Sequence, residues 1–250
     1  MNITPIKTHS ITSTDSSIAS LLDQYIKSIS EKSIIAVTSK IVSICEGSIV
    51  PLQSTNKETL VEQEADYFLP KNINPYGFHF TIKNNTMIAS AGIDVSNGNG
   101  YYILWPRNPQ KSANDIRQHL CKKHGVKHIG VIIVDSKTIP LRRGTVGTTL
   151  SASGFLAIHD YRGTKDLFGY TMRVSTANIA EGLGAAAVLA MGEGTESTPI
   201  VVMEDLPNVV FQEHNPTNAE LEETSISLED DLYAPILKGA PWIRGKKRIR

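Results

Sequence analysis

Apolar residues along the chain follow two different spacings. A period close to that of an α-helix, or a run of helix-forming residues, predicts helices over residues 14–30, 57–68, 112–124 and 176–191. Short apolar or alternating runs predict strands over residues 33–37, 129–134, 148–154, 170–175 and 199–203. Residues 76–93 predict a hairpin that turns at Asn84–Asn85. The hydroxyl-rich residues 38–50 predict a strand, a turn and a second strand.

These elements do not show the regular strand–helix alternation of a parallel α/β protein. The sequence therefore predicts an α+β (mixed α/β) fold in which helices pack on mixed sheets. No linker clearly divides the chain, so residues 1–210 are taken as one unit and residues 211–250 as a polar C-terminal segment. That segment is predicted as a loosely ordered loop with a short helix, and its basic end as a solvated terminus. The helix over residues 176–191 is crowded with alanine and glycine, which predicts close packing against a neighbouring backbone.

The composition narrows the class of protein. Of the 250 residues 40% are hydrophobic, and 25 basic side chains balance 25 acidic ones. This balance is typical of a globular protein and argues against a dedicated nucleic-acid binder. Cys45 and Cys121 suggest neither a disulfide framework nor a zinc site. The first residues lack the features of a signal peptide, and no apolar run approaches the roughly 20 residues that span a bilayer. We therefore expect a cytoplasmic protein that binds neither nucleic acid nor membrane.

Three segments place an acid beside small or hydroxyl residues. Asp94 follows one predicted strand, Asp135 and Ser136 follow another, and Glu193 stands between two glycines after the alanine-rich helix. Each segment alone is also what an ordinary turn or helix end contains. Together they offer carboxylates for hard metal ions, glycine amides for phosphates and, at Arg142–Arg143, guanidinium groups for anions. This combination is typical of phosphoryl-transfer sites.

Other familiar site patterns are missing from the sequence. It contains neither a GxxxxGK[ST] loop nor a GxGxxG fingerprint, so a nucleotide would bind here without either device. Histidines 119, 124 and 128 lie close together, but Gly125 interrupts a shared helix face and no acid or cysteine completes a metal set. They are interpreted as surface residues. No Ser/His/Asp or Cys/His arrangement can be read from the sequence.

Four segments occur in an order and at a spacing that resemble one protein family. They are GIDVSN at 92–97, VIIVDS at 131–136 followed by RRG, DYRGTKDLFG at 160–169 and MGEG at 191–194. From about residue 34 to residue 203 the chain resembles the coenzyme F-420-0:γ-glutamyl ligases. The resemblance implies a family-specific mixed fold, an intertwined homodimer and a ligase-like catalytic unit within residues 1–210.

The same resemblance implies the chemistry. Such ligases use GTP, with ATP as the alternative, and Mg²⁺ or Mn²⁺ to add L-glutamate to a cofactor carboxylate. The implied acceptor is the deazaflavin F-420-0, and folate, which is also extended by glutamates, is a second candidate. The expected route phosphorylates the acceptor carboxylate, and the amine of glutamate then attacks the acyl phosphate.

The resemblance also assigns roles by position. It implies metal binding by Asp94, Asp135, Ser136 and Glu193. It implies nucleotide contacts by Ser39, Asn97 and the loop residues Met191, Gly192, Gly194, Thr195, Glu196, Ser197 and Thr198, with Lys40 as a substitute contact. Arg142 and Arg143 are expected to hold a phosphate or the anionic acceptor, and are taken as the catalytic residues.

Two places depart from the family pattern. Ile44 stands where the family commonly has a nucleotide-contacting lysine, and Lys40 replaces it only if a strand there keeps a straight register. Residues 137–139 replace a segment that often contains glycine and arginine. The departures fit retained chemistry on a different acceptor, and equally a non-catalytic nucleotide-binding relative. A different nucleotide-dependent acyl or phosphoryl transferase is the third alternative.

Overall fold

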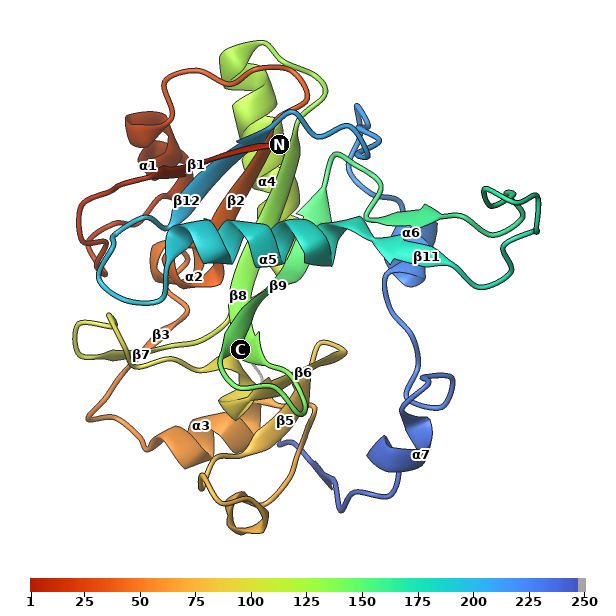
Figure 1. Ribbon diagram of the computed structural model, residues 1–250. Helices are drawn as coiled ribbons and strands as arrows, with labels where there is room; N and C mark the ends of the chain where they lie inside the picture. Colours follow the sequence, from red (N-terminus) through yellow and green to blue (C-terminus); the bar gives the residue numbers. More distant parts are fainter. Residues whose placement is uncertain (247–250) are drawn as a thin grey trace.

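The computed structural model describes residues 1–246, and within them the largest sheet has the strand order β1–β12–β2–β8–β9 (Figure 1). These strands are β1 (Asn2–Ile6), β12 (Ile200–Glu204), β2 (Ile34–Thr38), β8 (Gly130–Thr138) and β9 (Thr145–Ser153). β2 and β8 are parallel, and the other neighbouring pairs are antiparallel. This mixed sheet, with the helices that cover it, confirms the predicted α+β class.

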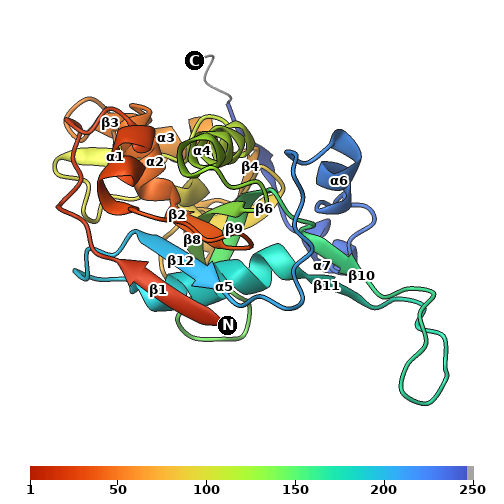
Figure 2. The ribbon, with the colours of Figure 1, turned by 90° about the horizontal axis from the view of Figure 1, so that it is seen from above.

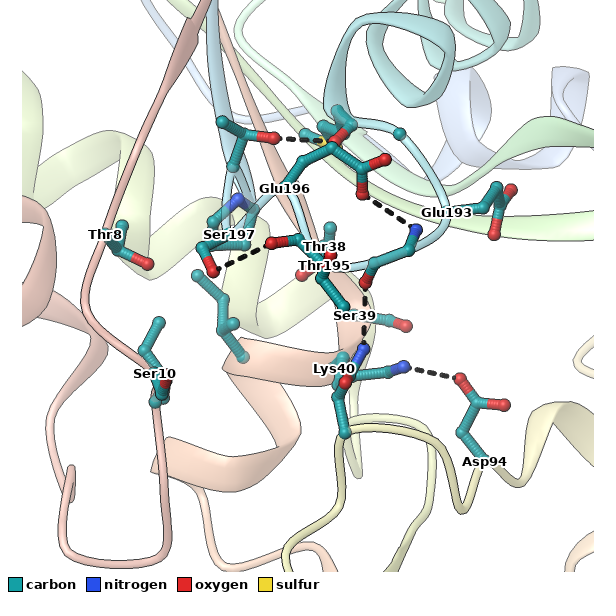
Figure 3. A pocket seen from close by; sticks show the side chains of 18 of the residues that line it. Thr8, Ser10, Thr38, Ser39, Lys40, Asp94, Glu193, Thr195, Glu196 and Ser197 are labelled. Atoms are coloured by element: carbon teal, nitrogen blue, oxygen red, sulfur yellow. Dashed lines mark hydrogen bonds and ion pairs between the residues drawn. The ribbon is translucent and has the colours of Figure 1, made fainter.

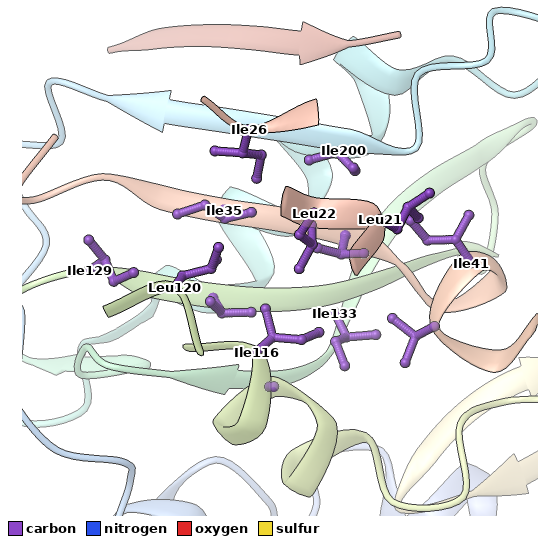
Figure 4. Packing of buried hydrophobic residues seen from close by; sticks show 14 of the residues in the cluster. Leu21, Leu22, Ile26, Ile35, Ile41, Ile116, Leu120, Ile129, Ile133 and Ile200 are labelled. Atoms are coloured by element: carbon purple, nitrogen blue, oxygen red, sulfur yellow. The ribbon is translucent and has the colours of Figure 1, made fainter. Parts of the chain in front are cut away.

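Alternate residues of the central strands pack on opposite faces of the large sheet. Ile35 and Val37 of β2 join a buried cluster with α1 (Ile18–Tyr25) and α4 (Pro109–His124), which Figure 4 shows. The intervening residues of β2 join a second cluster under α5 (Ile179–Met191). Because both faces are covered, β2 and β8 are apolar along most of their length rather than alternating. This burial fixes the strand ends, where the polar residues begin.

A smaller sheet lies beside the large one and has, among the described residues, the order β13–β4–β5–β6. Its strands are β13 (Ile243–Arg244), β4 (Tyr67–Phe68), β5 (Phe80–Lys83) and β6 (Thr86–Ala89). Other elements are α2 (Ser39–Cys45), α3 (Lys57–Glu64), α6 (Asn218–Glu223), α7 (Ala234–Leu237), the paired strands β3 (Ile49–Pro51) and β7 (Tyr101–Ile103), and the 3₁₀ turns η1 (Lys71–Ile73) and η2 (Ser90–Gly92). The short helix α6 confirms the one predicted after residue 211. The basic end predicted as solvated lies mostly outside the described residues.

A two-stranded ribbon projects from the body of the molecule. It is built from β10 (Ile158–Asp160) and β11 (Thr176–Asn178), and Figures 1 and 2 show its loop extending well beyond the sheets. No helix within residues 1–246 is long and apolar enough to cross a membrane.

Two predicted strands are wrong. Residues 39–45 form the helix α2 instead, because Ile41, Val42 and Ile44 are buried and this burial outweighs the weak preferences of the hydroxyl residues. Residues 170–175 lie in the exposed loop of the ribbon, where a single bridge joins Lys165 to Thr171 and no sheet covers the chain. The strand β11 begins only at Thr176.

The remaining predicted elements are present with shifted boundaries. The helix predicted over residues 176–191 begins at Ile179, the one over 14–30 spans only Ile18–Tyr25, and the one over 57–68 ends at Glu64. The strand predicted over 129–134 continues to Thr138. The hairpin turn is confirmed, with φ of 47° at Asn84 and 57° at Asn85.

The glycines of α5 and β9 let these two elements approach closely. A Cβ at Gly184 would lie 2.3 Å from Oγ1 of Thr149, and a Cβ at Gly147 would lie 2.4 Å from the carbonyl oxygen of Gly184. Gly182 stands two positions earlier, on the other side of the helix, and a Cβ there would meet open space. The close packing predicted for the alanine-rich helix is therefore confirmed.

Gly184→Ala should lower the free energy of unfolding by about 1–3 kcal/mol, because the added methyl group overlaps β9. Gly182→Ala is the matched control and should raise it by up to about 1 kcal/mol through helix propensity alone. Urea unfolding of both variants measures the difference. Equal effects of the two substitutions would contradict close packing at Gly184.

Candidate functional site

A cavity of about 710 Å³ opens where the parallel strands β2 and β8 part (Figure 3). Its volume is in the range of small-molecule and cofactor sites. Every residue predicted to bind metal or nucleotide lines it: Ser39, Lys40, Asp94, Asn97, Asp135, Ser136, Met191, Gly192, Glu193, Gly194, Thr195, Glu196, Ser197 and Thr198. Four segments far apart in sequence therefore meet around one space.

Asp135 is placed by the end of the β2–β8 ladder. The ladder stops at the pair Thr38–Val134, so Asp135 is the first residue of β8 beyond it. A register shift between Ile133 and Val134 in the pairing with β9 marks a bulge, a feature that redirects neighbouring side chains. Oδ1 of Asp135 accepts a hydrogen bond from the backbone N–H of Ser136 at 2.8 Å. Oδ2 accepts one from Nε1–H of Trp105 at 2.5 Å.

The surroundings of Asp135 oppose its negative charge. Desolvation by the protein raises the pKa of Asp135 to about 6, and the charge of Asp94 acts in the same direction. The hydrogen bonds from Trp105 and from the backbone N–H of Ser136, and the charge of Lys40, lower the pKa of Asp135 but do not offset the desolvation. A carboxylate held this way gains from a cation in the cavity.

Asp94 is presented by an unusual turn. Ser90, Ala91 and Gly92 all have positive φ, at 53°, 53° and 68°, which is costly for the first two because they carry a Cβ. The hydroxyl of the fully buried Thr81 accepts the N–H of Ala91 at 2.9 Å and donates to the carbonyl of Ile88. The turn thus depends on one buried side chain of the smaller sheet.

Lys40 and Ile44 both line the cavity from α2. Lys40 is expected from the sequence to replace the family's lysine at position 44 only if this segment is a straight strand, and the helix corrects that expectation. A spacing of four residues is about one helical turn, so the side chains of Lys40 and Ile44 lie on one face of α2. Nζ of Lys40 lies 2.8 Å from Oδ2 of Asp94 and donates to the carbonyl of Ser96 at 3.1 Å, and Figure 3 shows this pair at the cavity.

The loop after α5 closes another side of the cavity. Glu193 accepts hydrogen bonds from the hydroxyls of Ser136 at 3.2 Å and Thr145 at 3.1 Å, so two predicted metal ligands, Ser136 and Glu193, are in contact. Gly194 donates its N–H to Glu196 at 2.8 Å, and its carbonyl accepts from Asn97 at 3.3 Å. These side-chain hydrogen bonds hold the backbone N–H and carbonyl groups of Gly194 at the cavity.

The sequence interpretation missed the N-terminal wall of the cavity. Thr8, His9, Ser10, Ile11 and Thr12 line it, and the N–H of Thr8 donates to the carbonyl of Ser197 at 2.8 Å. The hydroxyl-rich run THSITST was the available signal. The resemblance to the family begins only at about residue 34, so it assigns no role to this run.

Arg142 and Arg143 do not line the cavity. They lie in the exposed turn between β8 and β9, and Nη1 of Arg142 donates to the carbonyl of Leu141 at 3.1 Å. Their catalytic role stays a prediction.

The four predicted metal ligands offer hard oxygen donors, which suit Mg²⁺ or Mn²⁺. As they stand, no three acidic, histidine or cysteine side chains within residues 1–246 lie close enough together to hold a metal ion. The ammonium of Lys40 instead lies against Asp94, and its charge reaches Asp135 as well. The donor chemistry therefore fits a hard cation, with Lys40 supplying positive charge at the same place.

The charges on the cavity wall are unequal. Four carboxylates from Asp94, Asp135, Glu193 and Glu196 face the single ammonium of Lys40 among the described lining residues. A phosphate-bearing ligand would be repelled by this wall unless divalent cations accompanied it.

The fold is that of an α+β protein with a cavity at the ends of two parallel strands. A family model described as F420-0:Gamma-glutamyl ligase matches residues 5–205. A Methanopyrus kandleri protein named Coenzyme F420:L-glutamate ligase is 31% identical over 194 residues, covering 70% of this chain and 76% of that protein. A Methanococcus maripaludis protein of the same name is 31% identical over 209 residues, covering 77% and 83%. One from Methanocaldococcus jannaschii is 39% identical over 136 residues, covering 53% and 54%.

The chain therefore belongs to the F420-0:gamma-glutamyl ligase family, which confirms the resemblance carried by the four segments. It is accordingly an enzyme, a ligase that forms amide bonds.

Thr81→Val should lower the free energy of unfolding by about 1–3 kcal/mol, because it leaves the buried N–H of Ala91 without an acceptor. Thr81→Ser keeps the hydroxyl and should recover most of the loss. Thermal or urea unfolding of the two variants provides the test. If Thr81→Ser were as unstable as Thr81→Val, the hydroxyl would not be what supports the turn before Asp94.

Proposed function

We propose that this chain is a γ-glutamyl ligase that uses GTP and a divalent cation to add L-glutamate to F420-0. The observation that carries the proposal is the acid-rich cavity itself. It combines glycine-flanked backbone, several hydroxyl groups and four carboxylates from three separate segments. The relatives named Coenzyme F420:L-glutamate ligase support F420-0 over folate as the acceptor. ATP remains the alternative nucleotide to be tested.

The unequal charges of the cavity support the requirement for metal. Asp94, Asp135, Ser136 and Glu193 would hold Mg²⁺ or Mn²⁺, which when bound neutralises charge on the nucleotide phosphates. Without such a cation the carboxylates would oppose a triphosphate.

The remaining residues of the cavity are suited to holding the nucleotide. We assign Ser39, Lys40 and Asn97 to nucleotide contacts, because each presents a hydroxyl, ammonium or amide group to the cavity. The loop over residues 191–198 would contact it through backbone N–H groups and hydroxyls. Lys40 can leave Asp94 for a phosphate when a cation takes its place beside the carboxylate.

The proposed reaction has two steps. A carboxylate oxygen of the acceptor attacks the γ-phosphorus of GTP, an acyl phosphate forms and GDP leaves. The amine of L-glutamate then attacks the acyl carbon, the C–N bond forms, inorganic phosphate leaves and the amine loses a proton. We assign Arg142 and Arg143 to the anionic acceptor, since exposed guanidinium groups can pair with carboxylate or phosphate oxygens of a ligand that extends beyond the cavity.

The purified protein with GTP, Mg²⁺ or Mn²⁺, L-glutamate and F420-0 should yield a product heavier by one or more glutamyl units, detected by mass spectrometry. A reduced folate offered in the same mixture tests the second acceptor, and ATP in place of GTP tests the nucleotide. Removal of the metal by a chelator should abolish product formation. Nucleotide cleavage without either product would indicate another acyl or phosphoryl transferase, and neither cleavage nor product would favour the non-catalytic alternative.

Asp135→Ala in the same assay should reduce product formation by at least about 100-fold at a fixed metal concentration, as loss of a metal ligand does. Glu229→Ala, which removes an exposed carboxylate of the C-terminal segment, is a control for the loss of negative charge. Unchanged nucleotide affinity and turnover in Asp135→Ala would refute the metal assignment.

We further propose that the ribbon mediates a homodimer. Its loop exposes 98% of Leu167, 86% of Phe168, 75% of Tyr170 and 85% of Val174. Large apolar side chains clustered on a projecting loop are typical of an interaction surface. A second copy of the chain is the proposed partner because the family resemblance implies an intertwined dimer. Cytoplasmic location is likewise retained as a proposal, supported by the two unpaired cysteines.

Leu167→Ser combined with Phe168→Ser should convert a dimer to a monomer in analytical ultracentrifugation, since it removes the apolar tip of the ribbon. Tyr76→Ser, at an 80% exposed residue elsewhere, is the matched control and should leave the dimer intact. A wild-type protein that sediments as a monomer at all concentrations would contradict the dimer.

A further inference from the structure

The buried indole of Trp105 contacts Asp135, a residue of the cavity wall. Trp105 follows β7, is only 2% exposed and does not line the cavity. Its Nε1–H nevertheless donates to Oδ2 of Asp135 at 2.5 Å. The sequence around Trp105 gives no sign of this contact, because the two residues lie thirty positions apart.

The position of the indole is fixed from two further sides. A Cβ at Gly92 would lie 2.1 Å from Nε1 of Trp105, so only glycine leaves room for the ring there. On another side, Nζ of Lys83 lies 5.4 Å from the centre of the ring, close enough for a cation–π contact. Lys83 is in turn paired with Glu64 at 3.0 Å, and both side chains are nearly buried. The smaller sheet and α3 therefore hold the ring that contacts Asp135.

We propose that Trp105 is a positioning residue, whose indole N–H fixes the carboxylate of Asp135 in the orientation that binds the divalent cation. This inference rests on the proposed metal site at Asp135. The two oxygens of that carboxylate are each held by one donor, Oδ1 by the backbone N–H of Ser136 and Oδ2 by Trp105. Each oxygen keeps a further acceptor direction for the cation.

The physical consequence is a ligand that does not need to reorganise when the cation arrives. A carboxylate free to rotate would lose conformational freedom on binding, and a carboxylate turned away from the cavity would not bind at all. Hydrogen bonds from residues behind metal ligands typically contribute 10–100-fold to metal affinity. The indole N–H is suited to this because it is a donor only, so it cannot compete as a ligand.

A purely structural role for Trp105 predicts something different. If the ring only fills space, then its shape matters and its N–H does not. Replacing the tryptophan by β-(3-benzothienyl)alanine changes the N–H to sulfur and retains the bicyclic shape. In a Trp242→Phe background this replacement falls on position 105 alone, because the chain contains two tryptophans.

The experiment measures the dissociation constant of Mn²⁺ from the full chain with GTP present, using the electron paramagnetic resonance signal of free Mn²⁺. The benzothienyl protein should bind Mn²⁺ about 10–100-fold more weakly than the Trp242→Phe protein, with unfolding temperatures that remain close. Trp105→Phe should show at least the same loss of affinity. Trp242→Phe alone is the matched control, because Trp242 stacks on Phe80 and donates to the carbonyl of Leu237, away from the cavity.

The outcomes separate the two proposals. Mn²⁺ affinity that falls in Asp135→Ala but is unchanged in the benzothienyl protein would overturn the role of Trp105 and leave the proposed metal site standing. Affinity that is the same in wild type and Asp135→Ala would overturn the metal site and the inference with it. A loss of affinity in both proteins, without loss of folded structure, supports the positioning role.

Discussion

The parallel ladder between β2 and β8 is the constraint on which the rest of the site depends. It pairs Ile34–Thr38 with Gly130–Val134, two segments almost a hundred residues apart in sequence. Where this ladder ends, Ser39 and Asp135 become neighbours at the same edge of the sheet. Both strands are apolar and covered on both faces, so the register is set by burial, and a slip of one residue would exchange the two faces. The polar groups of the cavity are placed by the packing of residues that never contact a ligand.

The cavity concentrates negative charge, and the surrounding structure offsets part of it. Lys40 pairs with Asp94, and Trp105 and a backbone N–H hold Asp135. Even so, desolvation raises the pKa of Asp135 to about 6, so its surroundings disfavour the charged carboxylate. The divalent cation proposed for this cavity would stabilise that charge.

The departures from the family pattern acquire a different meaning in the structure. Ile44 and Lys40 lie on one face of α2, so a positive charge is present at the cavity although it occupies a different turn of the helix. The change at residues 137–139 lies at the end of β8 and in the turn beyond it, away from the cavity lining. The first departure places Ile44 in the cavity wall where the family commonly has a lysine, whereas the second lies outside the wall.

The sequence by itself determined the α+β class, the central strands, the hairpin at Asn84–Asn85 and the family, because these follow from local periodicity and from short ordered motifs. It also identified the acids and the loop after α5 that meet in the cavity. Tertiary structure alone decided that residues 39–45 are helical, since their burial against α1 and β2 outweighs local preference. It also decided that residues 8–12 form a cavity wall and that Trp105 contacts Asp135. These last features depend on contacts between distant segments, which no local pattern records.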